Sequence, residues 1–339
     1  MKLGQHAART DPGRKRRGNE DSYVCRPPLF AIADGMGGAR AGEVASALAA
    51  GALEETGAGS GGVAHVVELI QEANRRVHDR ASTDAETSGM GTTITVALLE
   101  SDGTVTMGHV GDSRAYLLRD ERLEQLTDDH SLVAELVRRG ELSPQAAEVH
   151  PQRSVITRAL GTDPDVDVDA FPVEAHAGDV FLICSDGLSD MVDGEQIEAI
   201  LKTHRADLDG AAKALVQAAN RAGGEDNITA ILFELVEGEA SAREPDEQTR
   251  EIAMPPHIGE EDTLHPEDAV APPPRAAANG DAAPADTMVV AAADIDAAIA
   301  AQESTDAPQA GIGRRLLALA VIVALAAVIV VLVWWGLAR

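Results

Sequence analysis

Four strand-like segments of this sequence adjoin an aspartate that stands beside glycine or another small residue. These aspartates are Asp34 in IADGMGG, Asp112 in HVGDSR, Asp186 in CSDGLSD and Asp226 in GEDN. Taken singly, each fits a solvated turn. Paired strands, however, bring their ends to one edge of a sheet, and carboxylates gathered there repel one another unless they bind cations or take up protons. The pattern therefore favours a fold that collects these strand ends around a cation.

The segment FAIADGMGGARAGEVAS (30–46) shows the pattern in its fullest form. Its apolar run ends on Asp34, and glycines follow at 35, 37 and 38. Glycine permits unusual dihedral angles and a close approach of backbone to a ligand. Oxygen ligands suit Mg²⁺ or Mn²⁺. We therefore expect bare backbone around Asp34 to leave room for bound ions.

The sequence lacks the residue patterns that are typical of other metal sites and other phosphatases. No Cys/His spacing typical of structural zinc is present. Cys184 has no arginine six positions on, so the loop of a cysteine phosphatase is absent. The stretch DVDVD (165–169) resembles a phospho-aspartate motif, but its fifth residue is Asp169, where Thr or Val is expected. It is better interpreted as an exposed connection.

Hydrophobic periodicity indicates runs of strands and pairs of helices within residues 1–236. This order favours an α+β layered sandwich over a wound βαβ sheet. The expected strands are 22–25, 30–33, 91–100, 103–110, 111–119, 179–187 and 228–235, and the expected helices are 42–55, 63–80, 132–140, 195–203 and 209–222.

Charge and cysteine usage limit the partners and the compartment. The chain of 339 residues has a net charge of -28, which excludes nucleic acid as a partner of its whole surface. The two cysteines, without an N-terminal signal peptide, fit a reducing cytosol. Residues 237–310 hold 17 acidic residues against three arginines, a net charge of -14. We expect 237–313, rich in Pro and Ala, to be a disordered acidic linker.

The C-terminal part predicts a membrane anchor at 314–339. Residues 316–335 are 20 apolar residues without a charge, and as a helix they would span about 30 Å, the hydrocarbon thickness of a bilayer. Trp334 and Trp335 stand at an interfacial position. Arg314 and Arg315 precede the span and only Arg339 follows it, so we expect a single pass through the cell membrane with residues 1–236 in the cytoplasm.

Seven motifs, in order and spacing, resemble those of a known family. They are TDPGRKRRGNED, ADGMGG, MGTTITVALL, HVGDSRAYLL, HPQRSVITRALG, LICSDGLSDMV and GGEDNITAILFEL. Over about residues 8–236 the chain is similar to bacterial metal-dependent protein Ser/Thr phosphatases of the type 2C or PPM family. The resemblance implies a four-layer α-β-β-α sandwich with two central β-sheets. It also implies hydrolysis of phosphoserine and phosphothreonine with two tightly bound Mn²⁺ or Mg²⁺ ions and a third, weaker one.

The resemblance also assigns roles to individual residues. Asp34 would bridge two metal ions, and Gly35 would give its backbone carbonyl to one of them. Asp186 and Asp226 would complete the ligands of the first ion, while Glu20 and Asp21 would hold metal-bound water. Two such ions lower the pKa of bound water and stabilise both ends of an in-line displacement.

Two further assignments concern a third ion and the substrate. Asp112 would ligate the weaker ion, with Ser154 as a further contributor. Arg16 would grip the substrate phosphate as a bidentate fork. The other cations of the run at 14–17 fit a generic basic patch equally well.

One position departs from eukaryotic members of the family. They carry a proposed general acid, a histidine, where this sequence has Met36, and bacterial relatives also read DGMGG. The resemblance therefore leaves the proton donor unassigned. His130 and His150 flank the segment that carries Ser154, but a surface position explains either one equally well.

The function implied is that of a membrane-tethered phosphatase acting on phosphoserine and phosphothreonine proteins. By the same resemblance, a transmembrane Ser/Thr kinase and its targets are the expected partners. Two alternatives remain, a pseudophosphatase that docks partners through the same fold and a membrane-tethered scaffold. Intact residues at every metal position argue against the first.

Overall fold

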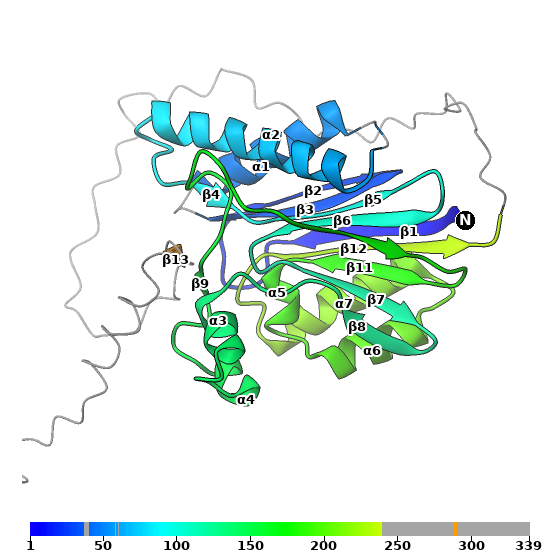
Figure 1. The fold of residues 1–339 in the computed structure, drawn as a ribbon. Coiled ribbons are helices and arrows are strands. Elements are labelled where there is room, and N and C mark those ends of the chain that lie inside the picture. Colours follow the sequence, from blue (N-terminus) through cyan, green and yellow to red (C-terminus); the bar gives the residue numbers. More distant parts are fainter. Residues whose placement is uncertain (37–40, 58, 60, 239–287, 290–339) are drawn as a thin grey trace, which may run out of the picture. The chain divides into compact units, whose positions relative to one another are not determined.

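The computed structural model describes residues 1–36, 41–57, 59, 61–238 and 288–289 (Figure 1). The predicted membrane span at 316–335 and nearly all of the predicted linker at 237–313 lie outside these residues. Within the described ranges, no helix combines the length and the apolarity needed to cross a membrane.

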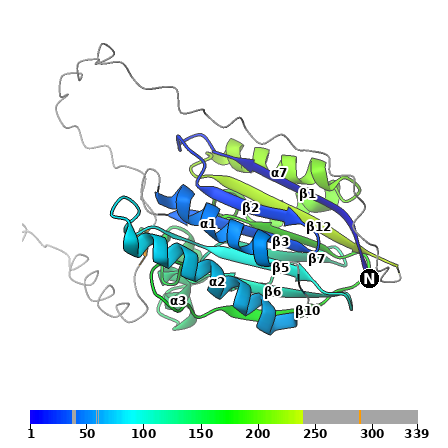
Figure 2. The same ribbon diagram turned by 90° about the horizontal axis from the view of Figure 1, so that it is seen from above.

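One antiparallel sheet joins the two ends of the domain. Its strand order is β1-β12-β11-β7-β8, with β1 (Lys2–Asp11), β12 (Ile228–Val236), β11 (Val180–Cys184), β7 (Arg114–Arg119) and β8 (Arg122–Gln125). The sequences of β11 and β12 are almost continuously apolar because both faces of these strands are covered. Figure 2 shows β1 and β12 side by side.

The second antiparallel sheet carries the strand that ends near Asp34. Its order is β10-β6-β5-β3-β2, with β10 (Asp169–Glu174), β6 (Thr104–Val110), β5 (Ile94–Leu99), β3 (Leu29–Met36) and β2 (Asp21–Arg26). The short strand β4 (Gly91–Thr92) pairs with the end of β3. In the register of β2 and β3, Asp21 lies opposite Asp34.

An aromatic stack holds the two sheets face to face. The ring of Phe233 lies 4.3 Å from that of Phe30 and 4.9 Å from that of Phe181, measured between centroids. Phe30 belongs to one sheet and the other two rings to the other, and all three are fully buried. Burial of such large side chains is the main favourable term in holding layers together.

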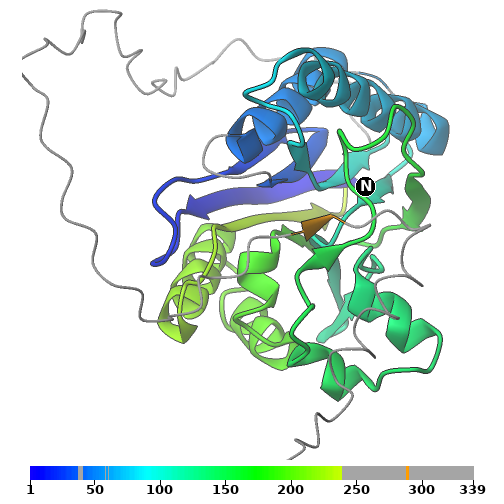
Figure 3. The same ribbon diagram turned by 90° about the vertical axis from the view of Figure 1, so that its left-hand side faces the viewer.

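Helices cover the outer faces of both sheets, so the layers run helix, sheet, sheet, helix (Figure 3). On one side lie α1 (Ala41–Thr56) and α2 (Gly62–Thr83). On the other lie α5 (Asp186–Ser189), α6 (Gly194–Thr203) and α7 (Leu208–Ala222). Asp193 and Asp207 cap α6 and α7 through their side chains. The predicted α+β sandwich is confirmed.

A small lobe projects from one end of the sheets (Figure 1). This segment, residues 131–160, is called the flap below. It contains α3 (Leu132–Arg138), α4 (Pro144–Glu148) and β9 (Val155–Ile156), and Ser131 and Ser143 cap its two helices. The strand β9 pairs in parallel with β13 (Met288–Val289).

Several features differ from the sequence-based expectations. The predicted strand at 179–187 is shorter, because β11 ends at Cys184 and Asp186 begins α5. The strand β1 was not expected. The predicted run of strands from 91 to 119 is divided, because β6 and β7 belong to different sheets and the chain crosses between them at 111–113. The DVDVD stretch was expected to be a connection throughout, yet Asp169 begins β10.

Candidate active site

Asp34 is positioned through its backbone. Its N–H donates to Thr93 Oγ1 at 3.1 Å, and its carbonyl accepts from Thr93 N at 2.9 Å and from Thr92 Oγ1 at 2.8 Å. These bonds tie the end of β3 to the start of the β4–β5 segment. Burial, and then the negative charges of four other acids, raise the pKa of the Asp34 carboxyl; these acids are Asp21, Asp186, Asp226 and Asp112.

Gly35 is required by a close approach of backbone. A Cβ added there would lie 2.1 Å from the carbonyl oxygen of Gly42 and 2.7 Å from that of Glu20. The space beside Gly35 is thus filled by the chain itself, whereas we expected bare backbone there to leave room for ions. Gly37 and Gly38 lie outside the described residues.

Asp186 and Asp226 come from the other sheet. Asp186 begins α5 directly after β11, and Asp226 lies just before β12. Ser185 ties the two segments together, since its N–H donates to Thr229 O at 3.1 Å and its hydroxyl oxygen accepts from Thr229 N at 2.9 Å. The two sheets therefore each supply acids to one place.

Asn227 is a positioning residue that sequence reasoning missed. Its side-chain amide donates to Pro12 O at 3.0 Å and to Gly18 O at 2.9 Å, and its side-chain carbonyl accepts from Glu20 N at 2.7 Å. It thereby fixes the loop of Arg16 against the segment of Asp226. The only signal in the sequence was its place directly after the GED triplet.

Asp112 lies where the chain crosses between the sheets, and it is 8% exposed. Burial, together with the negative charges of Asp129 and Asp190, raises its pKa to about 7. Asp190, one helical turn after Asp186, was also missed. Its spacing of four residues in SDGLSD was the available signal.

The pKa values of other acids in the cluster are raised in the same way. Burial first, then the charges of Asp112, Asp190 and Asp226, raises the pKa of Asp186 well above its usual range. Burial and neighbouring acids likewise raise the pKa of Asp34. Burial is the main cause that raises the pKa of Asp21 to about 6, although Thr229 and Ser185 donate hydrogen bonds to it. A bound cation would reverse each of these shifts.

The donor set fits hard cations. One carboxylate oxygen of each of Asp21, Asp112 and Asp186 is buried without a hydrogen-bond partner among the described residues. Such oxygens are costly to bury unless they coordinate a cation or are protonated. No three Asp, Glu, His or Cys side chains of the described ranges already converge as a ligand set.

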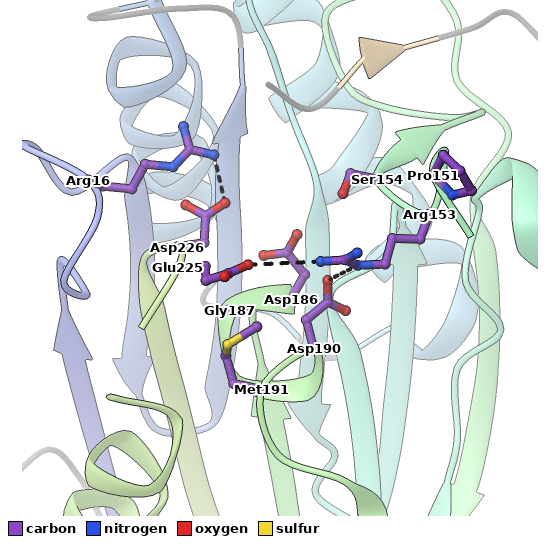
Figure 4. Close-up of a pocket in the computed structure, with 10 residues that line it drawn as sticks. All are labelled: Arg16, Pro151, Arg153, Ser154, Asp186, Gly187, Asp190, Met191, Glu225 and Asp226. Atoms are coloured by element: carbon purple, nitrogen blue, oxygen red, sulfur yellow. Dashed lines mark hydrogen bonds and ion pairs between the residues drawn. The ribbon is translucent and has the colours of Figure 1, made fainter. Parts of the chain in front are cut away.

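Arg16 is engaged by one of these acids. Its Nη2 lies 2.7 Å from Asp226 Oδ2. Both line a cavity of about 120 Å³ (Figure 4). The full lining consists of Arg16, Pro151, Arg153, Ser154, Asp186, Gly187, Asp190, Met191, Glu225 and Asp226. Of the predicted site residues, Asp34, Gly35, Glu20, Asp21 and Asp112 are not part of this lining.

The flap supplies the opposite wall of the cavity. Arg153, which sequence reasoning missed, reaches from the flap to within 3.6 Å of Asp190 and 3.9 Å of Glu225. In Figure 4 Arg16 and Arg153 approach the acids from opposite sides, with Ser154 beside Arg153. A small anion in the cavity would therefore have a guanidinium on each side.

Neither Met36 nor His130 faces the cavity. Met36 packs against Ile156 and Ala159 of the flap. His130 is 2% exposed, accepts a hydrogen bond from Gly111 N through Nδ1 at 3.0 Å, and accepts one from Thr157 N through its carbonyl at 2.8 Å. It braces the flap against the loop of Asp112. His150 is also absent from the cavity lining.

Comparisons with known proteins agree with this geometry. The family model described as Protein phosphatase 2C matches residues 18–228. The serine/threonine phosphatase stp of Listeria innocua is 41% identical over 238 residues, which cover 67% of this chain and 94% of that protein. The serine/threonine protein phosphatase PstP of Mycobacterium tuberculosis is 40% identical over 244 residues, which cover 71% of this chain and 47% of that protein.

Solved structures give the same result. The crystal structure of the Mycobacterium tuberculosis phosphatase PstP/Ppp aligns with a TM-score of 0.66 and 39% identity, covering 69% of this chain and all of that one. A structure of the PstP catalytic domain in complex with two manganese ions aligns with a TM-score of 0.64, 38% identity and coverages of 69% and 99%. The chain therefore belongs to the protein phosphatase 2C family and is a protein serine/threonine phosphatase.

Proposed function

We propose that the chain hydrolyses phosphoserine and phosphothreonine at the acidic cluster, using Mn²⁺ or Mg²⁺. The observation that carries this proposal is the set of buried carboxylates contributed by both sheets. Three of them have an oxygen without a hydrogen-bond partner in the part of the chain that the structure describes. A relative of known structure binds two manganese ions. Asp34, the carbonyl of Gly35, Asp186 and Asp226 would hold two ions, and Glu20 and Asp21 would hold their water.

When bound, these ions supply a Lewis acid for the phosphoryl oxygens and lower the pKa of water. The chain's own residues do the rest. Arg16 and Arg153 flank the cavity and orient the phosphoryl group by charge-assisted hydrogen bonds. Phosphate oxygens compete with Asp226 for Arg16.

Activity on a phosphothreonine peptide tests the proposal. The purified chain should be inactive after chelation and active once Mn²⁺ is restored. Inactivity in Mn²⁺, with the ions still bound, would instead identify a pseudophosphatase. Inactivity without ion binding would leave only the scaffold function.

Removal of Arg16 should chiefly weaken substrate binding. A charge-assisted hydrogen bond contributes about 1.5–3 kcal/mol, so Arg16→Ala should lower kcat/KM roughly 10- to 150-fold, mostly through KM. Arg16→Lys, which keeps the charge without the fork, should lose less. Steady-state kinetics on a phosphopeptide measure both. An unchanged KM and an unchanged turnover for Arg16→Ala would exclude a phosphate role.

We also propose that Asp112 binds a third, weaker ion, with Ser154 as a further contact. Asp112→Ala should then lose catalysis while two tight ions still bind. Isothermal titration with Mn²⁺ counts the ions, and Asp165→Ala, an exposed acid outside the cavity, is the control. Disappearance of the tight sites in Asp112→Ala would place this residue in the central pair.

We further propose that residues 314–339 anchor the enzyme in the cell membrane, with the acidic segment at 237–313 as a tether. Tethering raises the effective concentration of the enzyme near membrane phosphoproteins, such as a transmembrane Ser/Thr kinase and its substrates. The negative charge of the tether should keep it away from anionic lipid. The support is the uncharged run at 316–335 behind Arg314 and Arg315.

Cell fractionation tests the anchor. The full chain should sediment with membranes and resist protease added outside spheroplasts, and a chain ending at residue 236 should be soluble yet equally active on p-nitrophenyl phosphate. Recovery of the full chain in the soluble fraction, or digestion of the catalytic domain from outside, would contradict the topology.

A further inference from the structure

Three cations surround Arg16 on the loop between β1 and β2. Arg14, Lys15 and Arg17 are called the basic rim below. All three are exposed, whereas Arg16 between them is partly buried and lines the cavity. None of the three forms an ion pair with any residue that the structure describes, although Arg16 pairs with Asp226. The rim therefore presents exposed positive charge on the same loop that brings Arg16 into the cavity lining.

The loop that carries the basic rim is held rigidly. The backbone N–H groups of Arg14 and Lys15 donate to Gly224 O at 2.7 and 3.2 Å. Gly13 has a φ of +74°, and a Cβ added there would lie 2.2 Å from Asp226 O. Asn227 holds the loop on either side of the rim. The position of the rim relative to the cavity is thus fixed by backbone contacts.

The rim charges do not stabilise the fold. Elsewhere in the described domain most arginines pair with acids, as Arg76 does with Glu72 and Arg119 does with Asp179. Three unpaired like charges within four residues repel one another. Three positive charges so close together are unusual in a chain whose net charge is -28. Its physical use is to attract anions within about 10 Å, the Debye length at 0.1 M salt.

The cavity determines which anions come close. Because an extended chain advances about 3.3–3.6 Å per residue, residues one to three positions from a bound phosphoresidue lie within about 10 Å of it. We propose that the basic rim binds Asp and Glu side chains beside the phosphorylated residue, so that the enzyme prefers acidic phosphosites. This inference rests on the proposed function, in which the cavity receives the phosphoryl group.

Kinetics on matched peptides test the proposal. Two phosphothreonine peptides of equal length would differ only in carrying Glu or Gln at the three positions on each side. Exposed charge pairs are individually weak, so the full chain with Mn²⁺ should show about a 3- to 30-fold higher kcat/KM for the Glu peptide. The preference should collapse in 0.5 M salt and in the triple variant Arg14→Gln, Lys15→Gln, Arg17→Gln.

A matched control removes the same charge elsewhere. Lys2→Gln, Arg122→Gln, Lys213→Gln replaces three exposed cations that also form no ion pair among the described residues. This control should keep the preference. Both triple variants should hydrolyse p-nitrophenyl phosphate like the unmodified chain, because that ester has no flanking residues. If the unmodified chain did not hydrolyse p-nitrophenyl phosphate in Mn²⁺, the proposed function would be contradicted, and the proposal about the basic rim would not be the cause of the failure.

Three results would overturn the rim as a substrate-selecting surface. One is equal kcat/KM for the Glu and Gln peptides in the unmodified chain at low salt. Another is a rim variant that gains activity equally on both peptides, which would show that the rim holds an acidic segment of its own chain, such as 237–310. The third is a control variant that loses the preference as fully as the rim variant, which would show that net charge and not the rim causes the preference.

Discussion

Asp34→Asn should lower turnover on a phosphothreonine peptide by at least about a thousandfold, equivalent to roughly 4 kcal/mol of lost transition-state stabilisation. Asn is isosteric with Asp but lacks the charge that would hold two ions. The fold should persist, because Thr92 and Thr93 position this residue through its backbone. Circular dichroism and steady-state kinetics measure the two effects separately.

The control for Asp34→Asn is Asp165→Asn, which removes the same charge from an exposed position outside the cavity. It should leave turnover unchanged. If Asp34→Asn, stripped by chelator and reloaded with Mn²⁺, worked near the unmodified rate, the two-ion mechanism would be wrong.

The metal-free protein should lose stability as pH rises from 6.5 to 8. Acids with a raised pKa hold protons in the folded state that the unfolded state has already released, so their contribution falls as pH rises toward the folded pKa. Burial raises the pKa of Asp112 to about 7 and those of Asp34 and Asp186 well above the usual range. Each carboxyl still protonated should cost roughly 2 kcal/mol over this interval, or about 4–8 °C in Tm.

Between pH 6.5 and 8, stability is little affected by the titration of His109, which acts in the opposite direction at lower pH. Burial lowers the pKa of His109 to about 3, so His109 stabilises the fold as pH rises, but only up to its unfolded value near 6.5. Thermal unfolding in EDTA gives the slope, and Mn²⁺ should raise the Tm more at pH 8 than at pH 6.5. Asp112→Asn should flatten the slope. A metal-free Tm that rises between pH 6.5 and 8 would show that these acids are ionised in the folded chain.

The sequence predicted the parts of the fold that depend on local pattern. Helices α1, α2, α6 and α7 begin within one or two residues of their predicted starts, because the spacing of apolar residues is a local signal. The strand β1 was missed because its half-exposed residues KLGQHAARTD lack a clear alternation. The chain changes sheet at 111–113 because β6 and β7 pair with strands of different sheets. The local residue pattern does not indicate which strands will pair.

The site was predicted only in part, because some of its residues have a local signal in the sequence and others do not. Asp34, Asp186 and Asp226 were recognisable as acids at strand ends beside small residues. Asn227 and Arg153 act through partners distant in sequence, Gly18 and Asp190, which only the fold brings near. The packing of Met36 on the flap was equally invisible, because Ile156 and Ala159 are more than 100 residues away.

The pairing of β1 with β12 determines when the domain can finish folding during synthesis. The strand β1 is the first of the chain, β12 is the last of the two central sheets, and they lie side by side in one sheet. During synthesis at about 5–20 residues per second, β1 has to wait tens of seconds for its partner to leave the ribosome. Arg16 and Asp226 cannot meet before then. A nascent chain therefore has no phosphate-binding cavity until its last strand emerges, and truncation anywhere before residue 228 should yield a protein that cannot act on phosphorylated partners.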